Sequence, residues 1–288
     1  MSASGERIVE ANGVELCVET FGDPTNPAIL LIMGASASMD WWEDDFCTRL
    51  ADGSRYVIRY DLRDTGRSVT YEAGDPPYTM RDLADDAAGL VEAFGLAPAH
   101  VVAMSMGGAI AQLMTLDHPD RVASLTLIST GPSSPGPEDP DLPAMSEETR
   151  ARFADIEEPE WSDRDAVIDY FVQLGRASAG SSRPFDDAPI REVAGRAFDR
   201  TTSMASTMAN HHAMGETGRW RDRLGEIAVP TLVIHGADDP VVPFGNALAL
   251  VREIPGAELL ILESTGHELP RAVWDPAVGA ILTHTSGI

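Results

Sequence analysis

Short apolar runs recur along the chain and alternate with longer segments of helical period. The runs that we predict as strands cover residues 28–33, 56–60, 100–104, 122–128, 231–234 and 258–262. Most are apolar at every position, which is typical of parallel strands covered by helices on both faces. Between them, apolar positions at helical spacing predict helices, for example over 80–94 behind a Thr79 cap. This alternation predicts an α/β fold with a doubly wound, mostly parallel sheet.

One long segment interrupts the alternation. At the start of the chain, Asn12-Gly13 between two β-type runs predicts a hairpin. Residues 131–140 are rich in Gly, Pro and Ser, a composition typical of a linker, and 145–223 then have helix-like stretches without a convincing strand. The alternation returns at Val229. We therefore predict a core domain formed by residues 1–130 and 226–288, with residues 131–225 inserted as a helical cap.

The charge balance narrows the possible partners and chemistry. The 288-residue chain has a net charge of −25 and a pI near 4.4, and its 21 basic residues are all arginine. Without lysine, Schiff-base catalysis, pyridoxal phosphate attachment and a P-loop are impossible. So acidic a chain would be repelled by nucleic acid and by anionic membranes, and we expect neither as a partner.

Cysteine use and the first residues indicate the cellular compartment. Cys17 and Cys47 are too few for a disulfide framework in a chain of this length. Residues 1–10 have no basic start and no apolar stretch, so we expect no signal peptide. The apolar run 28–33 is far short of the ~20 residues that span a bilayer. We expect a cytoplasmic protein.

The segment Val-Val-Ala-Met-Ser-Met-Gly-Gly, residues 101–108, is the most informative in the chain. It resembles the G-x-S-x-G nucleophile elbow, with Ala103 replacing the first glycine. In that motif a strand turns sharply into a helix with the serine at a strained apex, so the residues two before and two after it must be small. Ser105 is therefore our candidate nucleophile. The alternative is a small-residue turn that carries an incidental serine.

Serine chemistry also needs a base and a buried acid that orients it. Asp239 lies in an acidic turn after the predicted strand 231–234, and His267 follows the predicted strand 258–262. Both lie past the carboxyl ends of strands, where active sites of open α/β sheets form. No H-E-x-x-H or comparable ligand spacing occurs, so we expect neither a metal nor a cofactor.

Two further segments extend these motifs into a family resemblance. Leu-Ile-Met-Gly-Ala-Ser, residues 31–36, resembles the H-G-x-x oxyanion loop of the α/β-hydrolase family, with Met33 replacing histidine. Asp-Leu-Arg-Asp-Thr-Gly-Arg-Ser, residues 61–68, resembles the D-x-R-G-x-G-x-S segment of that family, with Asp64 at a glycine position. The resemblance covers essentially the whole chain. The opening Arg-Ile-Val, the Phe-Gly-Asp-Pro turn, the Met-Gly of the oxyanion loop and the Ser-Met-Gly of the elbow are similar to the aclacinomycin methylesterase branch of the family.

The resemblance implies a site and a reaction. It favours Asp239 over Asp238 as the acid, because the family places the acid three residues after a glycine, here Gly236. It also implies that the backbone N–H groups of Ala35 and Met106 form the oxyanion hole. The expected activity is a serine hydrolase that cleaves a carboxylic ester through an acyl-enzyme, with a methyl ester of a bulky, apolar small molecule as a candidate substrate.

Three alternative functions stay open. A cofactor-free haloperoxidase (perhydrolase) and a carbon–carbon bond hydrolase use the same triad, and a non-catalytic binding protein could use the same scaffold. Dehalogenases and epoxide hydrolases of this fold attack with an aspartate, and Ser105 at the elbow excludes them.

The cap supplies candidates for substrate contact. They are Trp161, Phe171, Met204, Met208, His212, Met214 and Trp220. The alternative is that these side chains form the packing between the cap's own helices. For the neighbouring His211-His212 pair, a solvated or packed role is the simpler interpretation. We further expect Asp64 to form a surface ion pair with Arg63 or Arg67.

Overall fold

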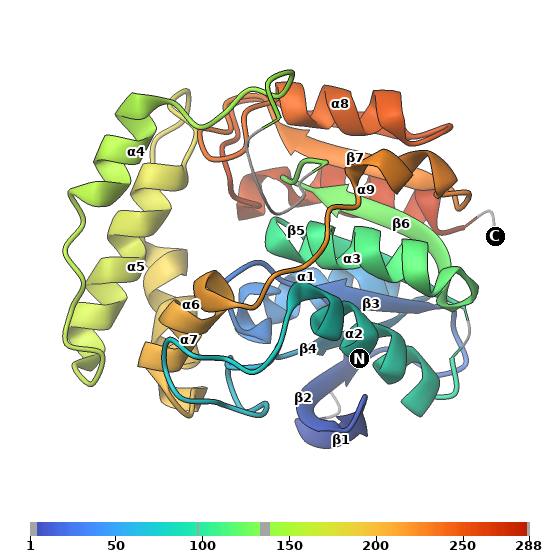
Figure 1. The fold of residues 1–288 in the computed structure, drawn as a ribbon, viewed down its shortest axis with the longest axis horizontal. Coiled ribbons are helices and arrows are strands. Elements are labelled where there is room, and N and C mark those ends of the chain that lie inside the picture. The colour runs from blue at the N-terminus through green and yellow to red at the C-terminus, as the bar shows by residue number, and fades with distance from the viewer. Residues whose placement is uncertain (1–4, 97, 133–138, 287–288) are drawn as a thin grey trace.

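The computed structural model describes residues 5–96, 98–132 and 139–286, and the sheet formed by these residues has eight strands (Figure 1). The strands are β1 (Arg7–Ala11), β2 (Val14–Phe21), β3 (Ala28–Ile32), β4 (Tyr56–Tyr60), β5 (Ala99–Met104), β6 (Val122–Ile128), β7 (Thr231–Gly236) and β8 (Glu258–Leu262). Their spatial order is β1-β2-β4-β3-β5-β6-β7-β8, with β3 to β8 parallel and β1 and β2 antiparallel. The predicted α/β fold with a mostly parallel sheet is confirmed.

Helices cover both faces of the sheet. Helices α2 (Met80–Ala93), α3 (Met106–Asp117) and α8 (Gly245–Glu253) pack on one face, and α1 (Asp44–Asp52) and α9 (Trp274–His284) on the other. Short 3-10 helices are η1 (Met39–Trp41), η2 (Pro119–Arg121), η3 (Arg221–Glu226) and η4 (Arg271–Val273). Within the described ranges, no helix is long and apolar enough to cross a membrane.

The central strands are apolar throughout because both of their faces are covered. In β3, Leu30 and Ile32 join the core beneath α2 and α3, whereas Ile29 and Leu31 join the core beneath α1 and α9. All four side chains are at most 1% exposed. The apolar runs of the sequence therefore predicted the buried strands directly, since alternation is lost when both faces are buried.

Local sequence signals set the ends of several elements. Asn12 and Gly13 both have positive φ, 49° and 73°, as a two-residue type I′ hairpin between β1 and β2 requires. Thr79 caps α2 through a reciprocal capping box with Asp82.

The four remaining helices lie between β6 and β7 in the chain. They are α4 (Glu147–Ala154), α5 (Arg164–Ser178), α6 (Ala188–Arg200) and α7 (Met204–Ala213). Figure 1 shows them gathered on one side of the sheet, at the left of the view. They share a small apolar core of Val167, Ile168, Phe171, Ala194 and Met204. Residues 133–138 of the predicted linker lie outside the described residues.

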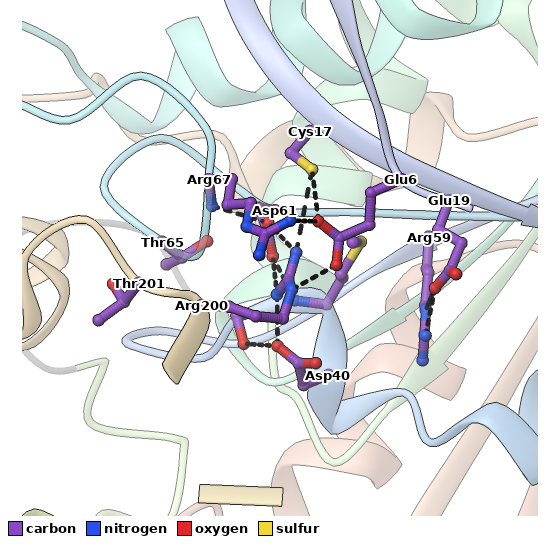
Figure 2. A network of polar contacts seen from close by, with 12 residues as sticks. Glu6, Cys17, Glu19, Asp40, Arg59, Asp61, Thr65, Arg67, Arg200 and Thr201 are labelled. Carbon is purple, nitrogen blue, oxygen red and sulfur yellow. Dashed lines mark hydrogen bonds and ion pairs between the residues drawn. The ribbon is translucent and has the colours of Figure 1, made fainter. Parts of the chain in front are cut away.

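Arg200, the last residue of α6, joins these helices to the sheet (Figure 2). Its guanidinium donates to Asp61 Oδ2 at 2.8 Å, to Glu6 Oε1 at 2.6 Å and to Asp40. Asp61 is fully buried, and it also accepts from the backbone N–H of Met39 at 2.9 Å. Burial raises the pKa of this carboxyl, which the ion pair with Arg200 opposes. The pairing keeps a charged group satisfied in the interior.

Candidate active site

Ser105 occupies the sharp turn between β5 and α3. Its φ of 55° and ψ of −124° lie outside the conformations that a serine normally adopts. A Cβ on Gly107 would lie 2.4 Å from the carbonyl oxygen of Ile32, so only glycine fits there. Ala103 is fully buried in β5. The small residues that flank the serine thus allow α3 to begin directly beneath it.

His267 lies between the hydroxyl and a carboxylate. Its Nε2 is 2.9 Å from Ser105 Oγ, and its Nδ1 is 2.9 Å from Asp239 Oδ2. The imidazole follows β8 and the carboxylate follows β7, so both lie past the carboxyl ends of neighbouring parallel strands. Three residues far apart in the sequence therefore form one continuous hydrogen-bonded series. If Nδ1 carries the proton, Nε2 is free to accept from the serine hydroxyl.

The Asp239 carboxylate is held by its own turn. Its Oδ1 accepts from the backbone N–H groups of Val241 and Val242 at 2.9 and 2.8 Å, and its side chain is fully buried. His235 Nε2 lies 3.5 Å from Asp239 Oδ2 and hydrogen-bonds the Val242 carbonyl at 2.8 Å. The backbone contacts orient the carboxylate toward His267. His235 packs beside the carboxylate and binds the turn that holds it.

The loop after β3 lies against the serine. A Cβ added to Gly34 would be 3.1 Å from Ser105 Cβ, which shows how closely the two backbones approach. Ala35 lines the same cavity as Ser105 and His267. Met106 is the first residue of α3, where backbone N–H groups lack intrahelical acceptors. The two predicted oxyanion-hole residues thus flank the serine from two different elements.

A cavity of about 550 Å³ opens beside these groups, a volume typical of small-molecule sites. The sheet domain lines it with Met33, Trp41, Phe46, Met104 and Trp274, and the segment between β6 and β7 lines it with Phe171, Leu174, Phe185, Ile190 and Met208. Two ion pairs border it, Arg183 with Glu268 and Arg271 with Glu43. The cavity can therefore take a large apolar ligand whose polar groups face the ion pairs.

Most of the predicted cap contacts do not reach this cavity. Of the candidates, Phe171 and Met208 line it, whereas Trp161, Met204, His212, Met214 and Trp220 do not. Trp161 and Met204 pack in the small apolar core shared by α5, α6 and α7, and Met214 and Trp220 pack against the core of the sheet domain. His212 is exposed. These five residues therefore do not line the cavity, and packing, the alternative interpretation, accounts for four of them, whereas His212 is exposed.

Asp64 also differs from expectation. It is 1% exposed, has a φ of 65°, and accepts from Tyr78 Oη and from the Tyr71 backbone N–H, both at 2.6 Å. Arg63 instead forms a buried two-point pair with Asp86. The positive φ explains why the related pattern has glycine here, since aspartate tolerates this conformation better than most residues.

Sequence reasoning missed the aromatic wall of the sheet domain and the role of His211. Trp41 and Trp274 stand in η1 and at the start of α9, outside the motifs, and no sequence signal distinguishes them from ordinary core residues. His211 is 4% exposed and hydrogen-bonds the backbone of the loop after β3. In the described part of the chain, no group of three or more His, Cys, Asp or Glu side chains is arranged to hold a metal ion.

Comparisons with known proteins identify the family of the chain. Residues 27–270 match the family described as the alpha/beta hydrolase fold. Rhodomycin D methylesterase DauP of Streptomyces sp. (strain C5) is 33% identical, and DnrP, the rhodomycin D methylesterase of Streptomyces peucetius, is 31% identical; each alignment covers 97% of both chains. The solved esterase EaEST of Exiguobacterium antarcticum has a TM-score of 0.77 over 96% of this chain and 98% of its own, at 22% identity, a likeness of fold.

The expected resemblance to this family, and to methylesterases within it, is confirmed by a full-length match. The chain belongs to the α/β-hydrolase fold family.

Proposed function

We propose that this protein is a serine hydrolase that cleaves a carboxylic ester through an acyl-enzyme. Ser105 is the nucleophile, His267 the general base and acid, and Asp239 the orienting carboxylate. One observation carries the proposal: hydroxyl, imidazole and buried carboxylate are joined by two 2.9 Å hydrogen bonds beside a large cavity. A nucleophile hydrogen-bonded to a base, itself oriented by a third group, is the arrangement that covalent catalysis requires.

The reaction follows from this arrangement. His267 Nε2 takes the proton of Ser105 Oγ as the oxygen attacks the ester carbonyl carbon. The resulting imidazolium is stabilised by Asp239 and then gives its proton to the leaving alcohol, so that the acyl group stays on Ser105. Water next attacks the acyl-enzyme with His267 as base. Collapse of the second tetrahedral intermediate releases the carboxylic acid and restores the hydroxyl.

The negative charge of each tetrahedral intermediate falls between two backbone donors. We propose the N–H groups of Ala35 and Met106 for this role. Loss of a single donor of this type costs roughly 2.7–4 kcal/mol of transition-state stabilisation in a comparable hydrolase. Both donors belong to the backbone, so a side-chain substitution at 35 or 106 does not remove the N–H group. Such a substitution can affect oxyanion binding only by changing the conformation of the backbone.

The cavity supports a bulky, apolar acyl group, with a methyl ester as the bond that is cleaved. Its walls are mostly aromatic, aliphatic and methionine side chains, and relatives of similar length are rhodomycin D methylesterases. We propose that residues 131–225 act as a cap domain that roofs the site, because Phe171, Phe185 and Met208 from this segment face the cavity. Methanol would be the leaving group.

Replacement of the nucleophile tests the proposal. We expect Ser105→Ala to keep the fold, measured by circular dichroism, and to lose turnover of a p-nitrophenyl ester by at least a factor of about 10⁴. A serine-directed fluorophosphonate should label the native chain and not the variant. The control Ser286→Ala changes an exposed serine at the end of α9 and should behave as wild type. Ester turnover by Ser105→Ala at the native rate would refute the assignment.

Substrate panels separate the related activities. A series of methyl esters graded by size should show rising kcat/KM up to a bulky polycyclic acid, as a cavity of this volume favours. Acetate with peroxide tests the perhydrolase alternative, and a dienone tests the carbon–carbon hydrolase alternative. Failure of fluorophosphonate labelling together with no turnover would favour a binding protein.

A further inference from the structure

His211 connects a cap helix to the loop that holds Ala35. From α7, its Nδ1 accepts from the backbone N–H of Ser36 at 2.9 Å, and its Nε2 lies 2.9 Å from the carbonyl oxygen of Arg63. The side chain is 4% exposed. One imidazole therefore links two loops of the sheet domain, the loop after β3 and the loop after β4.

The two contacts define which nitrogen carries the proton. Ser36 contributes an N–H donor, so Nδ1 must be the acceptor, and the hydrogen therefore sits on Nε2 and is donated to the Arg63 carbonyl. Burial lowers the pKa of His211 to about 4, which keeps the ring neutral near pH 7. A neutral ring in a single tautomer satisfies both loops at once.

The loop needs such an anchor at this point. Ser36 has a φ of 58°, a left-handed conformation that an isolated serine rarely adopts. Met33 stands where the related loops have a histidine, and a thioether cannot replace an imidazole as a hydrogen-bonding brace. The Ser36 N–H is one residue beyond Ala35, so its direction sets the orientation of the adjoining backbone.

Helix α7 is rigid enough to act as the anchor. Thr207 Oγ1 donates to the Asp64 carbonyl at 2.6 Å, and Ser206 Oγ donates to the Tyr71 carbonyl at 2.9 Å. Asn210 accepts from the Gly74 N–H at 2.6 Å. These bonds fix the helix to the loop after β4 independently of His211. Removal of the imidazole should therefore leave the helix in place.

We infer that His211 is a positioning residue that holds the oxyanion loop through the Ser36 N–H. The inference rests on the proposed function, because it assigns the Ala35 N–H to the oxyanion. His211 contacts neither Ser105 nor the cavity. Its effect falls on the transition state, where the oxyanion forms, and not on substrate binding.

Four variants test the inference with a p-nitrophenyl ester. His211→Leu removes the acceptor at similar volume. His211→Asn restores an oxygen near the Nδ1 position, whereas His211→Gln reaches toward the Nε2 position and so restores mainly the Arg63 contact. His212→Leu is the matched control, since this neighbour is exposed and does not line the cavity.

We expect His211→Leu to lower kcat about 10- to 100-fold with KM changed less than about twofold, because the donor is misplaced rather than removed. Asn should recover more of kcat than Gln. Inhibition by a phenylboronic acid, which forms a tetrahedral adduct with the serine, should weaken by the factor lost in kcat/KM. His212→Leu should match wild type in all three measurements.

Three results would overturn the inference. They are a folded His211→Leu with native kcat, a change confined to KM, and Asn no better than Gln. If Leu at 211 fails to fold, the comparison of Asn with Gln decides. Failure of the proposed function is distinct: wild type and Ser105→Ala would then have equal turnover, and both assignments would fall.

Discussion

Three non-glycine residues with a positive φ directly follow or lie in the loops after β3, β4 and β5. Ser36, Asp64 and Ser105 are non-glycine residues with φ of 58°, 65° and 55°. Each costs on the order of 1–3 kcal/mol and persists only where neighbours hold it. Ser36 is held by His211 and Asp64 by Tyr78. This strain therefore lies past the carboxyl ends of three neighbouring parallel strands.

The buried imidazole of His211 should make stability depend on pH. Its pKa is lowered to about 4 by burial, so between pH 4 and about 6.5 the unfolded chain binds a proton that the folded chain does not. Folding stability due to this group is complete above pH 6.5 and falls as the pH drops toward 4, by up to about 1.4 kcal/mol per pH unit. Asp64 raises the pKa of His211, and His212 lowers it.

Urea unfolding at several pH values measures this effect. We expect the free energy of unfolding of His211→Asn to fall less steeply than that of wild type between pH 6.5 and 4. His212→Asn, which replaces the exposed neighbour, should keep the native slope. Equal slopes for wild type and His211→Asn would show that residue 211 does not titrate differently in the two states.

Site residues could be predicted from the sequence where a short local motif marks them. The elbow around Ser105 and the chain order of Asp239 and His267 carry their signal within a few neighbouring residues. The environments of Asp64 and His211 depend on partners over a much wider span of sequence, such as Ser36, 175 positions from His211. No periodicity or spacing reports such contacts, so they emerge only from the fold.

Among the elements, the end of α5 lies against the loop that carries His267. The backbone N–H of His267 donates to the Ser178 carbonyl at 2.8 Å. A Cβ on Gly266 would lie 2.3 Å from the Gly180 nitrogen, and one on Gly180 would lie 2.9 Å from the Gly266 nitrogen. The two backbones touch, so the position of the imidazole depends on the segment at the end of α5.

Substitution of Gly266 by alanine should therefore displace His267. We expect Gly266→Ala to lower ester kcat by more than about tenfold, because the imidazole loses its alignment with Ser105. Overpacking should also cost about 1–3 kcal/mol of unfolding free energy. Steady-state kinetics and urea unfolding measure the two effects.

Gly279→Ala is the matched control. A Cβ at this position of α9 meets nothing within 4 Å. Alanine in a helix interior is favoured over glycine by roughly 0.5–1 kcal/mol, so this variant should gain stability and keep native kcat. Native kinetics for Gly266→Ala as well would show that the contact between the two backbones is not required.

The bounds of a strand could be predicted where a run of buried apolar residues defines the strand. Strands β4, β6 and β8 have the predicted bounds because their apolar runs end at polar or turn residues. Helix α3 begins at Met106, directly after Ser105, as the sharp turn of the elbow motif predicts. The arrangement of α4 to α7 had no such signal, because short helices are placed by tertiary packing.

At the scale of the whole molecule, the ion pair of Arg200 with Asp61 links α6 to the loop after β4. Asp61 is fully buried, and Arg200 is its cationic partner at 2.8 Å (Figure 2). We expect Arg200→Leu to lower the free energy of unfolding by about 3–5 kcal/mol, since it leaves a buried carboxylate without its counter-charge. Urea unfolding monitored by tryptophan fluorescence measures the loss.

The exposed pair of Arg164 and Asp199 provides the comparison within the same helices. Its side chains are 46% and 55% exposed, so Arg164→Leu should cost at most about 1 kcal/mol. Equal losses for the two arginine variants would mean that the Arg200 contacts do not stabilise the packing of α6 on the sheet domain.

Residues 131–225 contact both the loop that carries His267 and the loop that carries Ser36. These two contacts limit how the segment could be exchanged by engineering. Ser178 supports the backbone at His267, and His211 supports the backbone at Ser36. A segment grafted from another hydrolase to import its substrate preference would bring new cavity walls but would discard both supports. Grafts that retain residues 178 and 211 and the backbone conformation around them should keep turnover. Replacement of the whole segment 131–225 should change the substrate preference and lower the catalytic rate.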